Sequence, residues 1–522
     1  MTHVHSNWKN TYTNGITATD CYSGCTEITH VDDVDIGKSP YVNGLDEIPI
    51  AWGGYGFYSE LTGIYVFEIP SDNYTLTLET QWSANGLIGD GVVDWGDGTS
   101  TTGVTSHTYA TAGRYVVKMH GYTSGNNYCH NSISESLVEV VKLPYRDYNL
   151  AMLFNNCSKL TKVNMSNITG QIGYWFVNCT SLTEVIAYNV TLRGNSGVFQ
   201  GCLYLTKIEG MNTWDTSQVT SMTNFFNGCS SLTEIDVSSF DTSNVTTMEG
   251  MFRNHGGGVL PSKLRRIIGI EKFNTSKVTT MRYMFQGQNL LTELNIGGWD
   301  TPKLNNLYDC FSGCSNLTSL DLSNWNLSNC TNFDYMFTGC SKLITPPITT
   351  FGNADSPTTP IGYSQLYDGC TFTAKGITFK VVGACTLYRL FVNCKNLDST
   401  ITFEWNTDQQ VKVPGLFCQA KNISVLGNFN LTSCVDLFNG FFFGSIASQV
   451  NTNLTTFNCY GVQSYNLSIS NYPNLSKESI MNIINCLCET TETLTLTLGS
   501  TNMAKLTEAE IAIATNKGWT VA

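Results

Sequence analysis

The chain has 522 residues, of which 42% are hydrophobic and only 13% are charged, and its formal net charge is −13. That hydrophobic share is enough to bury a core, which excludes a disordered polymer. Phosphate backbones bind clustered Lys and Arg, so an acidic chain without such clusters is not expected to bind nucleic acid. The same balance excludes an anionic membrane surface, and no apolar run reaches the roughly 20 residues that a membrane span needs.

The first residues show no export signal. Residues 1–8 contain neither an apolar stretch nor a small-residue cleavage site, so they do not form a signal peptide. The composition, however, is rich in Ser, Thr, Asn and Gly, as it is in many extracellular and virion proteins. This combination indicates a protein that leaves its cell by lysis, as part of a virus particle.

Residues 1–60 are predicted to be a leader or attachment segment. They contain a stray fragment of the repeat described below, residues 21–28, and a run rich in aromatic residues and Gly, residues 52–58. The segment is either a flexible anchor or an edge packed against the next domain, and we favour the second interpretation.

Residues 61–145 have the alternating pattern of β-strands, as in residues 74–78. An Asp-Gly pair after a strand pattern predicts a hairpin. Two motifs of this block resemble the marks of PKD-like β-sandwiches: Trp95-Gly96-Asp97-Gly98-Thr99 and His107-Thr108-Tyr109. The resemblance implies a spacer or docking module in which His107 is structural.

Asp94 and Asp97 are the candidate calcium ligands of this block. Paired carboxylates supply the oxygen atoms that Ca²⁺ prefers. The alternative, which we favour, is that both carboxylates brace the turn by accepting hydrogen bonds from the backbone.

Residues 146–460 contain one recurring sequence motif, and successive copies are mostly 21 to 27 residues apart. The clearest copies begin at Phe226 and Phe311. Worn copies are marked by Phe154, Phe176, Phe199, Phe285, Phe337, Tyr367, Phe391, Phe417 and Phe438. Two longer steps, from Phe252 to Phe285 and from Phe337 to Tyr367, predict small insertions.

Each copy joins two local patterns. Leu-Thr-x-Leu-x-Leu alternates as a strand does, and Met-x-x-Met-Phe has the spacing of one helical turn. Asp-Thr-Ser-Asn between them supplies turn and cap chemistry. We therefore predict a short strand and a tight helical turn in each unit, with stacked units burying Leu, Met and Phe together. The recurring Phe and Cys are predicted to form ladders along the core.

The full repeat text resembles the BspA-like leucine-rich repeats of bacterial surface proteins and of some bacteriophage proteins. The resemblance covers residues 146–460, although the units after Pro346 depart from the pattern. It implies a leucine-rich-repeat solenoid, and most members of that family are adhesins or have no known function. Trp214, Trp299 and Trp325 recur in register beside Asp or Asn, so we expect them to pack in turns rather than to contact a ligand.

The 19 cysteines are predicted to be buried thiols rather than disulfides, because eight of them recur at one repeat position. These are Cys157, Cys179, Cys202, Cys229, Cys314, Cys340, Cys370 and Cys394. His255 replaces the ladder Cys of its copy and is interpreted as a core variant. Cys310 with Cys314, and Cys486 with Cys488, have metal-like separations, but structural zinc needs four ligands and no second pair follows. No metal or cofactor is therefore expected.

Residues 461–522 are predicted to be a small α/β cap over the last coil. Ser476 begins a helix with Ile480, Ile483, Ile484 and Leu487 on one face, and a strand follows at 494–499. Thr507 and Glu510 form a capping box for a last helix, which ends before Gly518. The string from Leu506 to Trp519 is similar to the endings of phage tail proteins and of surface proteins of gut bacteria.

No catalytic pattern is found. A polysaccharide hydrolase needs two carboxylates about 5 to 10 Å apart in one cleft. The repeat carboxylates Asp236, Asp241, Asp300 and Asp321 are instead spread over strand and turn positions. No nucleophile elbow and no phosphate loop occurs. We expect no enzyme, and the sequence does not indicate which residues bind a partner.

The predicted fold class is an α+β repeat: a PKD-like β-sandwich, a leucine-rich-repeat solenoid and a small α/β C-terminal cap. The predicted function is that of a non-enzymatic bacteriophage virion protein, in the tail or a fibre, that binds host surface protein or glycan through the solenoid. Other virion proteins are expected partners, and a homo-oligomer is compatible with the sequence. The alternatives are a bacterial cell-surface adhesin, a head-decoration protein without a receptor, and a polysaccharide hydrolase.

Overall fold

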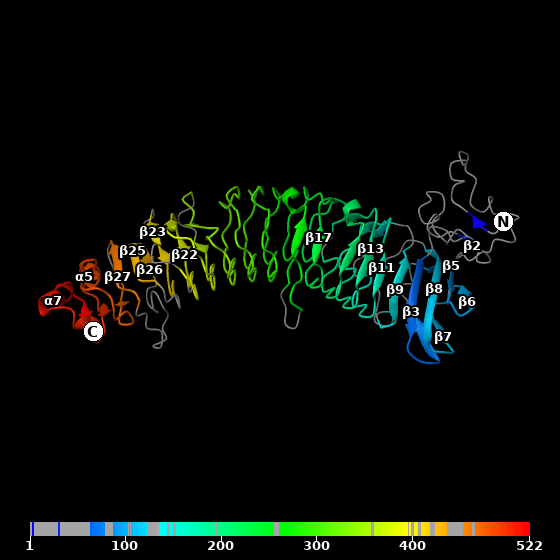
Figure 1. Ribbon diagram of the computed structural model, residues 1–522, viewed down its shortest axis with the longest axis horizontal. Coiled ribbons are helices and arrows are strands. Elements are labelled where there is room, and N and C mark those ends of the chain that lie inside the picture. The colour runs from blue at the N-terminus through cyan, green and yellow to red at the C-terminus, as the bar shows by residue number, and fades with distance from the viewer. Residues whose placement is uncertain are drawn as a thin grey trace. The chain divides into compact units, whose positions relative to one another are not determined.

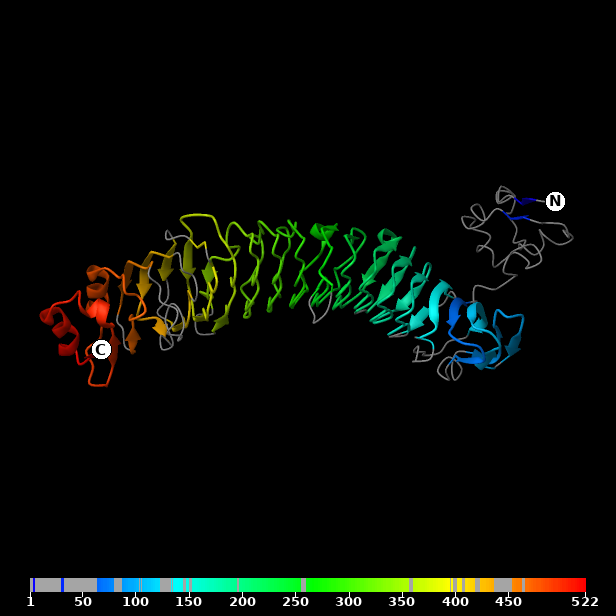
Figure 2. The same cartoon turned by 60° about the horizontal axis from the view of Figure 1, so that its bottom comes forward.

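The computed structural model describes residues 3–4, 30–31, 63–78, 87–102, 104, 106–122, 133, 135–143, 147–149, 153–194, 197–254, 260–355, 360–394, 396–397, 401–405, 409–417, 423–435, 453–461 and 465–522. Most of the leader, including residues 21–28 and 52–58, and the repeat positions His255 and Phe438 lie outside these ranges. The chain forms two compact units, residues 1–193 with 207–214, and residues 194–206 with 215–522. Figure 1 shows both as stacked, mostly β structures, and Figure 2 gives a second view.

The first unit contains the predicted sandwich and the first repeats. Its strands are β1 (His3–Val4), β2 (His30–Val31), β3 (Gly63–Ile69), β4 (Tyr74–Thr77), β5 (Leu87–Asp94), β6 (Ser100–Thr102), β7 (Ser106–Tyr109), β8 (Gly113–Tyr122), β9 (Leu137–Lys142), β10 (Asp147–Asn149), β11 (Lys162–Asn164), β12 (Thr169–Gln171), β13 (Glu184–Ile186), β14 (Thr191–Arg193) and β15 (Lys207–Glu209). A 3-10 turn, η4, spans Met211–Thr213.

One eight-stranded sheet joins the strands of residues 63–142 to the first repeats. Its order is β15-β13-β11-β9-β3-β8-β5-β6. β3 pairs antiparallel with β8 and β9, whereas β9 pairs parallel with β11 of the first coil. The predicted domain boundary after residue 145 therefore falls where hydrogen bonding between strands continues. β4 and β7 form a separate pair, and the PKD-like resemblance stays a prediction.

The second unit contains the remaining coils and the cap. Its strands are β16 (Asp215–Gln218), β17 (Glu234–Asp236), β18 (Arg266–Ile268), β19 (Thr350–Phe351), β20 (Ile361–Gly362), β21 (Thr378–Val381), β22 (Cys385–Thr386), β23 (Thr402–Trp405), β24 (Val411–Lys412), β25 (Val425–Asn430), β26 (Cys434–Val435), β27 (Thr456–Tyr460), β28 (Leu467–Ser468), β29 (Thr495–Thr497) and β30 (Thr520–Val521). Its helices are η5 (Ile270–Lys272), α5 (Lys477–Asn485), α6 (Ser500–Met503) and α7 (Glu508–Asn516).

The predicted aromatic ladder is confirmed. From Phe199 to Phe417, the marker rings of neighbouring coils in the second unit stack nearly parallel, with centroids 5.4 to 6.0 Å apart. Offset stacking of this kind adds to the free energy gained by burying the rings. Each coil thus supplies the missing half of its neighbour's core.

The cysteine ladder is also confirmed among the described residues, whose cysteines are all free thiols. The ladder thiols hydrogen bond to the carbonyl oxygen of the marker aromatic one coil earlier. Cys314 Sγ lies 3.3 Å from Phe285 O, and Cys340 Sγ lies 3.1 Å from Phe311 O. The recurring Cys therefore satisfies a buried backbone acceptor.

The Asp-Thr-Ser text forms the turn that the sequence indicates. Asp241 Oδ1 accepts the N–H of Ser243 at 2.9 Å, and the buried Thr242 hydroxyl donates to the Asn274 carbonyl of the next coil at 3.0 Å. The hydroxyls of Thr216, Thr275 and Thr301 likewise donate to a backbone carbonyl of the next coil. The Thr hydroxyls therefore hold successive turns together.

The predicted helical turn in Met-x-x-Met-Phe is wrong. The segment is a chain of tight turns whose third residue is left-handed, with φ of 61° at Gly250 and 59° at Tyr283. Met251 N bonds back to Met248 O within the coil, but Gly250 N donates to Arg282 O of the next coil. Because alternate N–H groups leave for the neighbouring coil, an α-helix cannot form. The α+β class is accordingly not confirmed: the chain is mostly β, with few helices.

The cap has the predicted elements. Ser476 caps α5, whose Ile480, Ile483 and Ile484 are buried. Thr507 and Glu510 form the capping box of α7. Gly518 follows that helix with a φ of 89°.

Replacing a ladder ring tests the stacking. Phe311→Ala is expected to destabilise the second unit by about 3–5 kcal/mol, because it leaves a cavity between two coils. Tyr204→Ala, whose side chain is 51% exposed, is the matched control and should stay within about 0.5 kcal/mol. Denaturant unfolding followed by tryptophan fluorescence measures both, and equal effects would contradict the ladder.

Acid should loosen α7. Hydrogen bonding by the Thr507 backbone, and then by Lys477, lowers the pKa of Glu510 to about 2. The stabilisation is therefore present above the unfolded pKa of about 4.5 and is lost as the pH falls toward 2. Glu510→Gln should be less stable than wild type at neutral pH, with the gap closing in acid. Thermal unfolding across this pH range measures the gap, and a gap that persists near pH 2 would contradict the prediction.

Candidate functional site

The sandwich turn uses both candidate calcium ligands for structure. Asp94 Oδ1 accepts the N–H of Gly96 at 3.0 Å, and Asp97 Oδ1 accepts the N–H of Thr99 at 3.0 Å. Asp97 Oδ2 also lies 2.6 Å from His107 Nε2. Burial raises the pKa of Asp97, but hydrogen bonds from Thr99 and His107 outweigh it and hold that pKa below its usual value. These contacts favour the turn-bracing interpretation.

His107 is part of the core of this turn, as expected. Its ring stacks on Trp95 at 5.1 Å and meets Tyr109 edge-on at 4.7 Å. The Tyr109 hydroxyl donates to the Trp95 carbonyl at 3.0 Å. The motif residues therefore support one another.

Three of the four repeat carboxylates accept hydrogen bonds from the backbone of their own turns. Asp236 accepts the N–H of Ser238, Asp241 that of Ser243, and Asp321 that of Ser323, each at 2.9 Å. These backbone bonds lower the pKa of Asp241 and Asp321. A general acid in a glycosidase needs a raised pKa, so neither carboxylate suits that role. Asp300 offers only its backbone carbonyl, to Thr275.

The metal-like cysteine pairs do not extend to a ligand set. No cluster of three or more His, Cys, Asp or Glu that could hold a metal occurs within the described ranges. Burial raises the pKa of Cys310 and Cys314 well above the usual thiol range. Both thiols are buried, and Cys314 takes its predicted ladder position on the Phe285 carbonyl.

The recurring tryptophans pack in the turns, as predicted. Their exposed fractions are 3% at Trp214, 1% at Trp299 and 7% at Trp325. Each indole N–H donates to a backbone carbonyl of the preceding coil, at Ala187, Ile270 and Ile296. They are therefore unsuited to contact a partner.

The sequence did not reveal a surface cluster on the turn side of the second unit. We name it the tyrosine–arginine patch, and its members are Arg253, Arg282, Tyr283, Tyr308 and Tyr335. All five side chains are half-buried. The rings of Tyr283, Tyr308 and Tyr335 meet in sequence at 5.4 and 5.5 Å. The guanidinium of Arg253 lies 4.3 Å from the Tyr283 ring centre, within cation–π range.

Hydrogen bonds hold the patch in place at its margins. Arg253 Nε donates to Gln286 at 2.7 Å, and Gln365 Nε2 donates to the Tyr335 hydroxyl at 3.2 Å. The Tyr283 hydroxyl bond, and then Glu249, raise the pKa of Arg282, so that guanidinium is charged at all physiological pH values. Its buried Nε has no partner among the described residues. The patch therefore presents rigid aromatic rings beside a fixed positive charge.

The backbone of the patch follows the turn that recurs along the solenoid. Tyr283 and Tyr335 both have a φ of 59°, and the equivalent position is also left-handed at Asn224, Gly250 and Tyr174. The left-handed residue is therefore a property of the repeat, and the side chains rather than the backbone distinguish the patch. Asn and Gly at the third position of Met-x-x-Met-Phe were the available signal for this turn.

A second feature arises where the strand side of the solenoid is interrupted. Between Ile268 and Thr350, all within the continuously described stretch 260–355, no strand forms, so the strand predicted for every unit is wrong for the copies that begin at Phe285 and Phe311. The two lengthened coils bound this interval, and cavities open beside both. One, of about 570 Å³, lies between β18 and residues 293–295. The other, of about 340 Å³, lies beside β19.

We call the cavity beside β19 the proline recess, because Pro347 lines it and Pro346 precedes Pro347 in the chain. Proline has no N–H with which to pair a neighbouring strand. The two coils touch before the recess, where Ile344 N donates to Thr318 O at 3.0 Å. They touch again at its margin, where Asn353 Nδ2 donates to Ser328 O at 2.8 Å. Between these two contacts the recess opens.

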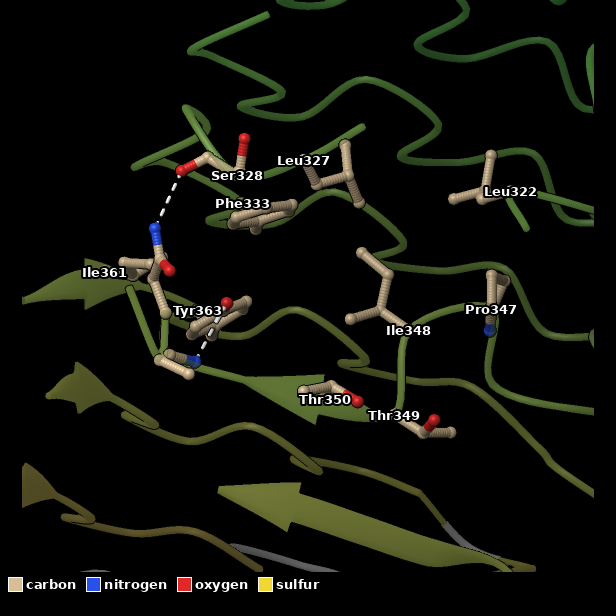
Figure 3. Close-up of a pocket in the computed structure, with 13 residues that line it drawn as sticks. Leu322, Leu327, Ser328, Phe333, Pro347, Ile348, Thr349, Thr350, Ile361 and Tyr363 are labelled. Carbon is tan, nitrogen blue, oxygen red and sulfur yellow. Dashed lines mark hydrogen bonds between the residues drawn. The ribbon is translucent and has the colours of Figure 1, made fainter. Parts of the chain in front are cut away.

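Apolar side chains form the walls of the proline recess. Figure 3 shows Leu327, Phe333, Ile348 and Tyr363 around one space. Phe333 and Tyr363 stack at 4.8 Å, and the Tyr363 hydroxyl accepts the N–H of Gly352 at 3.2 Å. The volume is at the lower end of the roughly 300–1,000 Å³ usual for ligand sites.

These coils define a β-rich repeat solenoid with two candidate binding features. Residues 172–256, 262–356 and 363–482 match the family described as "Mycoplasma protein of unknown function, DUF285". The matched residues make up more than half of the chain, which belongs to this family. A comparison with curated proteins found no match.

Two solved structures are similar to the chain. One is a leucine rich cell surface protein of Faecalibacterium prausnitzii, with 14% identity and a TM-score of 0.34, covering 75% of this chain and 97% of that one. The other is a leucine-rich repeat protein of Bacteroides ovatus, with 14% identity and a TM-score of 0.28, covering 65% of this chain and 91% of that one.

The described helices include none that is long and apolar enough to cross a membrane.

Thiol alkylation tests the structural role of the ladder cysteines. Burial raises the pKa of Cys314 to about 12, so near pH 8 only about one thiol in 10⁴ is ionised and reactive. Iodoacetamide should therefore spare Cys314 and Cys340 in the native chain but modify the half-exposed Cys486 and Cys488. Peptide mass spectrometry reads the result, with denatured chain as the control. Equal labelling of Cys314 and Cys486 would mean that the ladder is open to solvent.

Proposed function

We propose that the chain is a non-enzymatic binding scaffold of a bacterial cell surface, which holds a protein or glycan partner on the tyrosine–arginine patch. Tyr and Arg are the side chains that most often dominate the binding energy of protein interfaces. The patch presents three tyrosines and two arginines on neighbouring coils, and contacts between these side chains already order them. Ordering before binding lowers the entropy cost of association.

The observation that carries the proposal is the row of three half-buried tyrosine rings, whose centres lie 5.4 and 5.5 Å apart, with a guanidinium 4.3 Å from the first ring centre. The rings are partly exposed, so their outer edges are open to a partner. The cation–π contact and the ring contacts hold these side chains in one arrangement.

The bacterial surface is favoured over the virion as the location. The composition, low in charge and rich in hydroxyl and amide groups, suits either place. A phage tail, fibre or head-decoration role has no further observation in its favour. Immunogold labelling of source cells and of purified phage particles distinguishes the two: label on intact envelopes supports the proposal, and label confined to particles would contradict it.

A double substitution tests the patch. Tyr308→Ala with Tyr335→Asn is expected to weaken binding at least tenfold, or by about 1.4 kcal/mol, because two rings of the row are lost. Thermal stability should change little, since Asn suits the left-handed turn at 335. Binding is measured with fluorescent full-length chain on immobilised mucin and on a printed glycan array.

The matched control is Tyr204→Ala, which removes an exposed tyrosine of the same unit outside the patch. It should bind as wild type does. Wild-type binding by the double variant would remove the patch from the proposed function.

A further inference from the structure

The proline recess lies along an unpaired strand edge. β19 pairs with β21 through the carbonyls of Thr349 and Phe351, which accept from Lys380 N at 2.7 Å and Val382 N at 2.8 Å. A parallel strand uses alternate residues for its two neighbours. The N–H and C=O of Thr350 therefore point away from β21, to the side on which Thr350 lines the recess. No described strand pairs with that edge.

A second unused group borders the same space. Tyr363 is 2% exposed, and its hydroxyl accepts from Gly352 N–H but finds no acceptor for its own proton among the described residues. The neighbouring Tyr367 differs, because its hydroxyl both accepts from Ile348 N at 2.9 Å and donates to Ile348 O at 2.5 Å. A buried hydroxyl without an acceptor costs free energy, which an occupant with an acceptor oxygen would recover.

The walls suit an aliphatic side chain better than a sugar. Leu322, Leu327 and Ile348 line the recess, and Phe333 and Tyr363 already cover one another's faces at 4.8 Å. Both rings are only 2% exposed, so neither offers a free face on which a sugar ring could lie. A branched aliphatic group needs only the space and the apolar contacts.

The charge beside the recess indicates a neighbouring residue of the occupant. A second cavity, of about 380 Å³, shares Ser328, Asn353 and Ile361 with the recess and continues from it. Among the described residues that line the two cavities, Asp355 alone is charged, and it is exposed. Its carboxylate favours a cation at that end.

We propose that the proline recess binds an extended peptide by strand addition to Thr350, with an aliphatic side chain in the recess and a basic side chain, two residues away, beside Asp355. Strand addition obtains affinity from the backbone and specificity from pockets for alternate side chains. Residues two apart on a strand point to the same side, about 7 Å from each other. The site shares no residue with the tyrosine–arginine patch and is independent of the proposed function.

The test uses an array of immobilised five-residue peptides of alternating Thr, with every residue type at the second and fourth positions. Fluorescent full-length chain is the probe. We expect retention by peptides with Val, Ile or Leu at one varied position and Lys or Arg at the other. Leu327→Trp, which fills the recess, should reduce the retention at least tenfold. Ile344→Trp adds the same bulk at a 48% exposed position of a neighbouring coil, outside the recess, and should have no effect.

Asp355→Asn is the second variant. Because Asp355 is exposed, this variant should fold as wild type does. It should abolish the preference for Lys and Arg while retaining that for aliphatic residues. No aliphatic preference in wild type, or wild-type retention by Leu327→Trp, would overturn the proposal. Competition by chitin oligosaccharides in place of peptides would assign the recess to glycans and equally overturn it. Binding to mucin through the patch should be unchanged by Leu327→Trp, which separates the two sites.

Discussion

Each coil depends on backbone hydrogen bonds that leave it for its neighbour. On the turn side, Met248 N and Gly250 N donate to Thr280 O and Arg282 O of the next coil, while Met251 N closes a turn within its own coil. This alternation requires a left-handed residue at the third position of the turn. Buried backbone groups must be paired, so a coil without a neighbour would leave half of them unsatisfied. The ring, thiol and hydroxyl ladders add side-chain contacts to this framework.

The sequence predicted those parts of the fold in which the same side chain recurs at the same position of each coil. Phe, Cys and Asp-Thr-Ser each recur with the period of the coil. Stacked coils therefore place the Phe rings on one another, bury the Cys side chains and align the Asp-Thr-Ser turns. The cap was predictable because Ser476, Thr507 and Glu510 act on their own helices. The helical turn was predicted wrongly, since i, i+3, i+4 spacing does not distinguish a helix from linked tight turns. Only backbone bonding between coils decides that question.

The two candidate binding features were not predictable from the repeat text. The tyrosine–arginine patch brings together residues from positions 253 to 335, and their meeting depends on the coil spacing set by the backbone ladder. The proline recess needs both a missing N–H, at Pro346 and Pro347, and a lengthened coil that moves the strand away from its neighbour. The sequence indicated the insertion between Phe337 and Tyr367, but it gave no measure of the space that the insertion opens. The recurring residues of the repeat therefore predicted the buried core of the solenoid better than its surface features.

Both features lie where a local rule of the repeat is broken. Tyr283, Tyr308 and Tyr335 bring aromatic rings together on the turn surface, and Pro346 and Pro347 remove two N–H groups from the strand side of their coil. Natural sequences break such rules mainly at functional sites, where neighbouring structure over-determines the fold. In this chain the over-determination is the ring ladder, which continues through Phe285, Phe311 and Phe337 without a change in spacing. The core thus stays regular while the surface departs from the repeat, and the departures rather than the repeats distinguish this solenoid's binding chemistry.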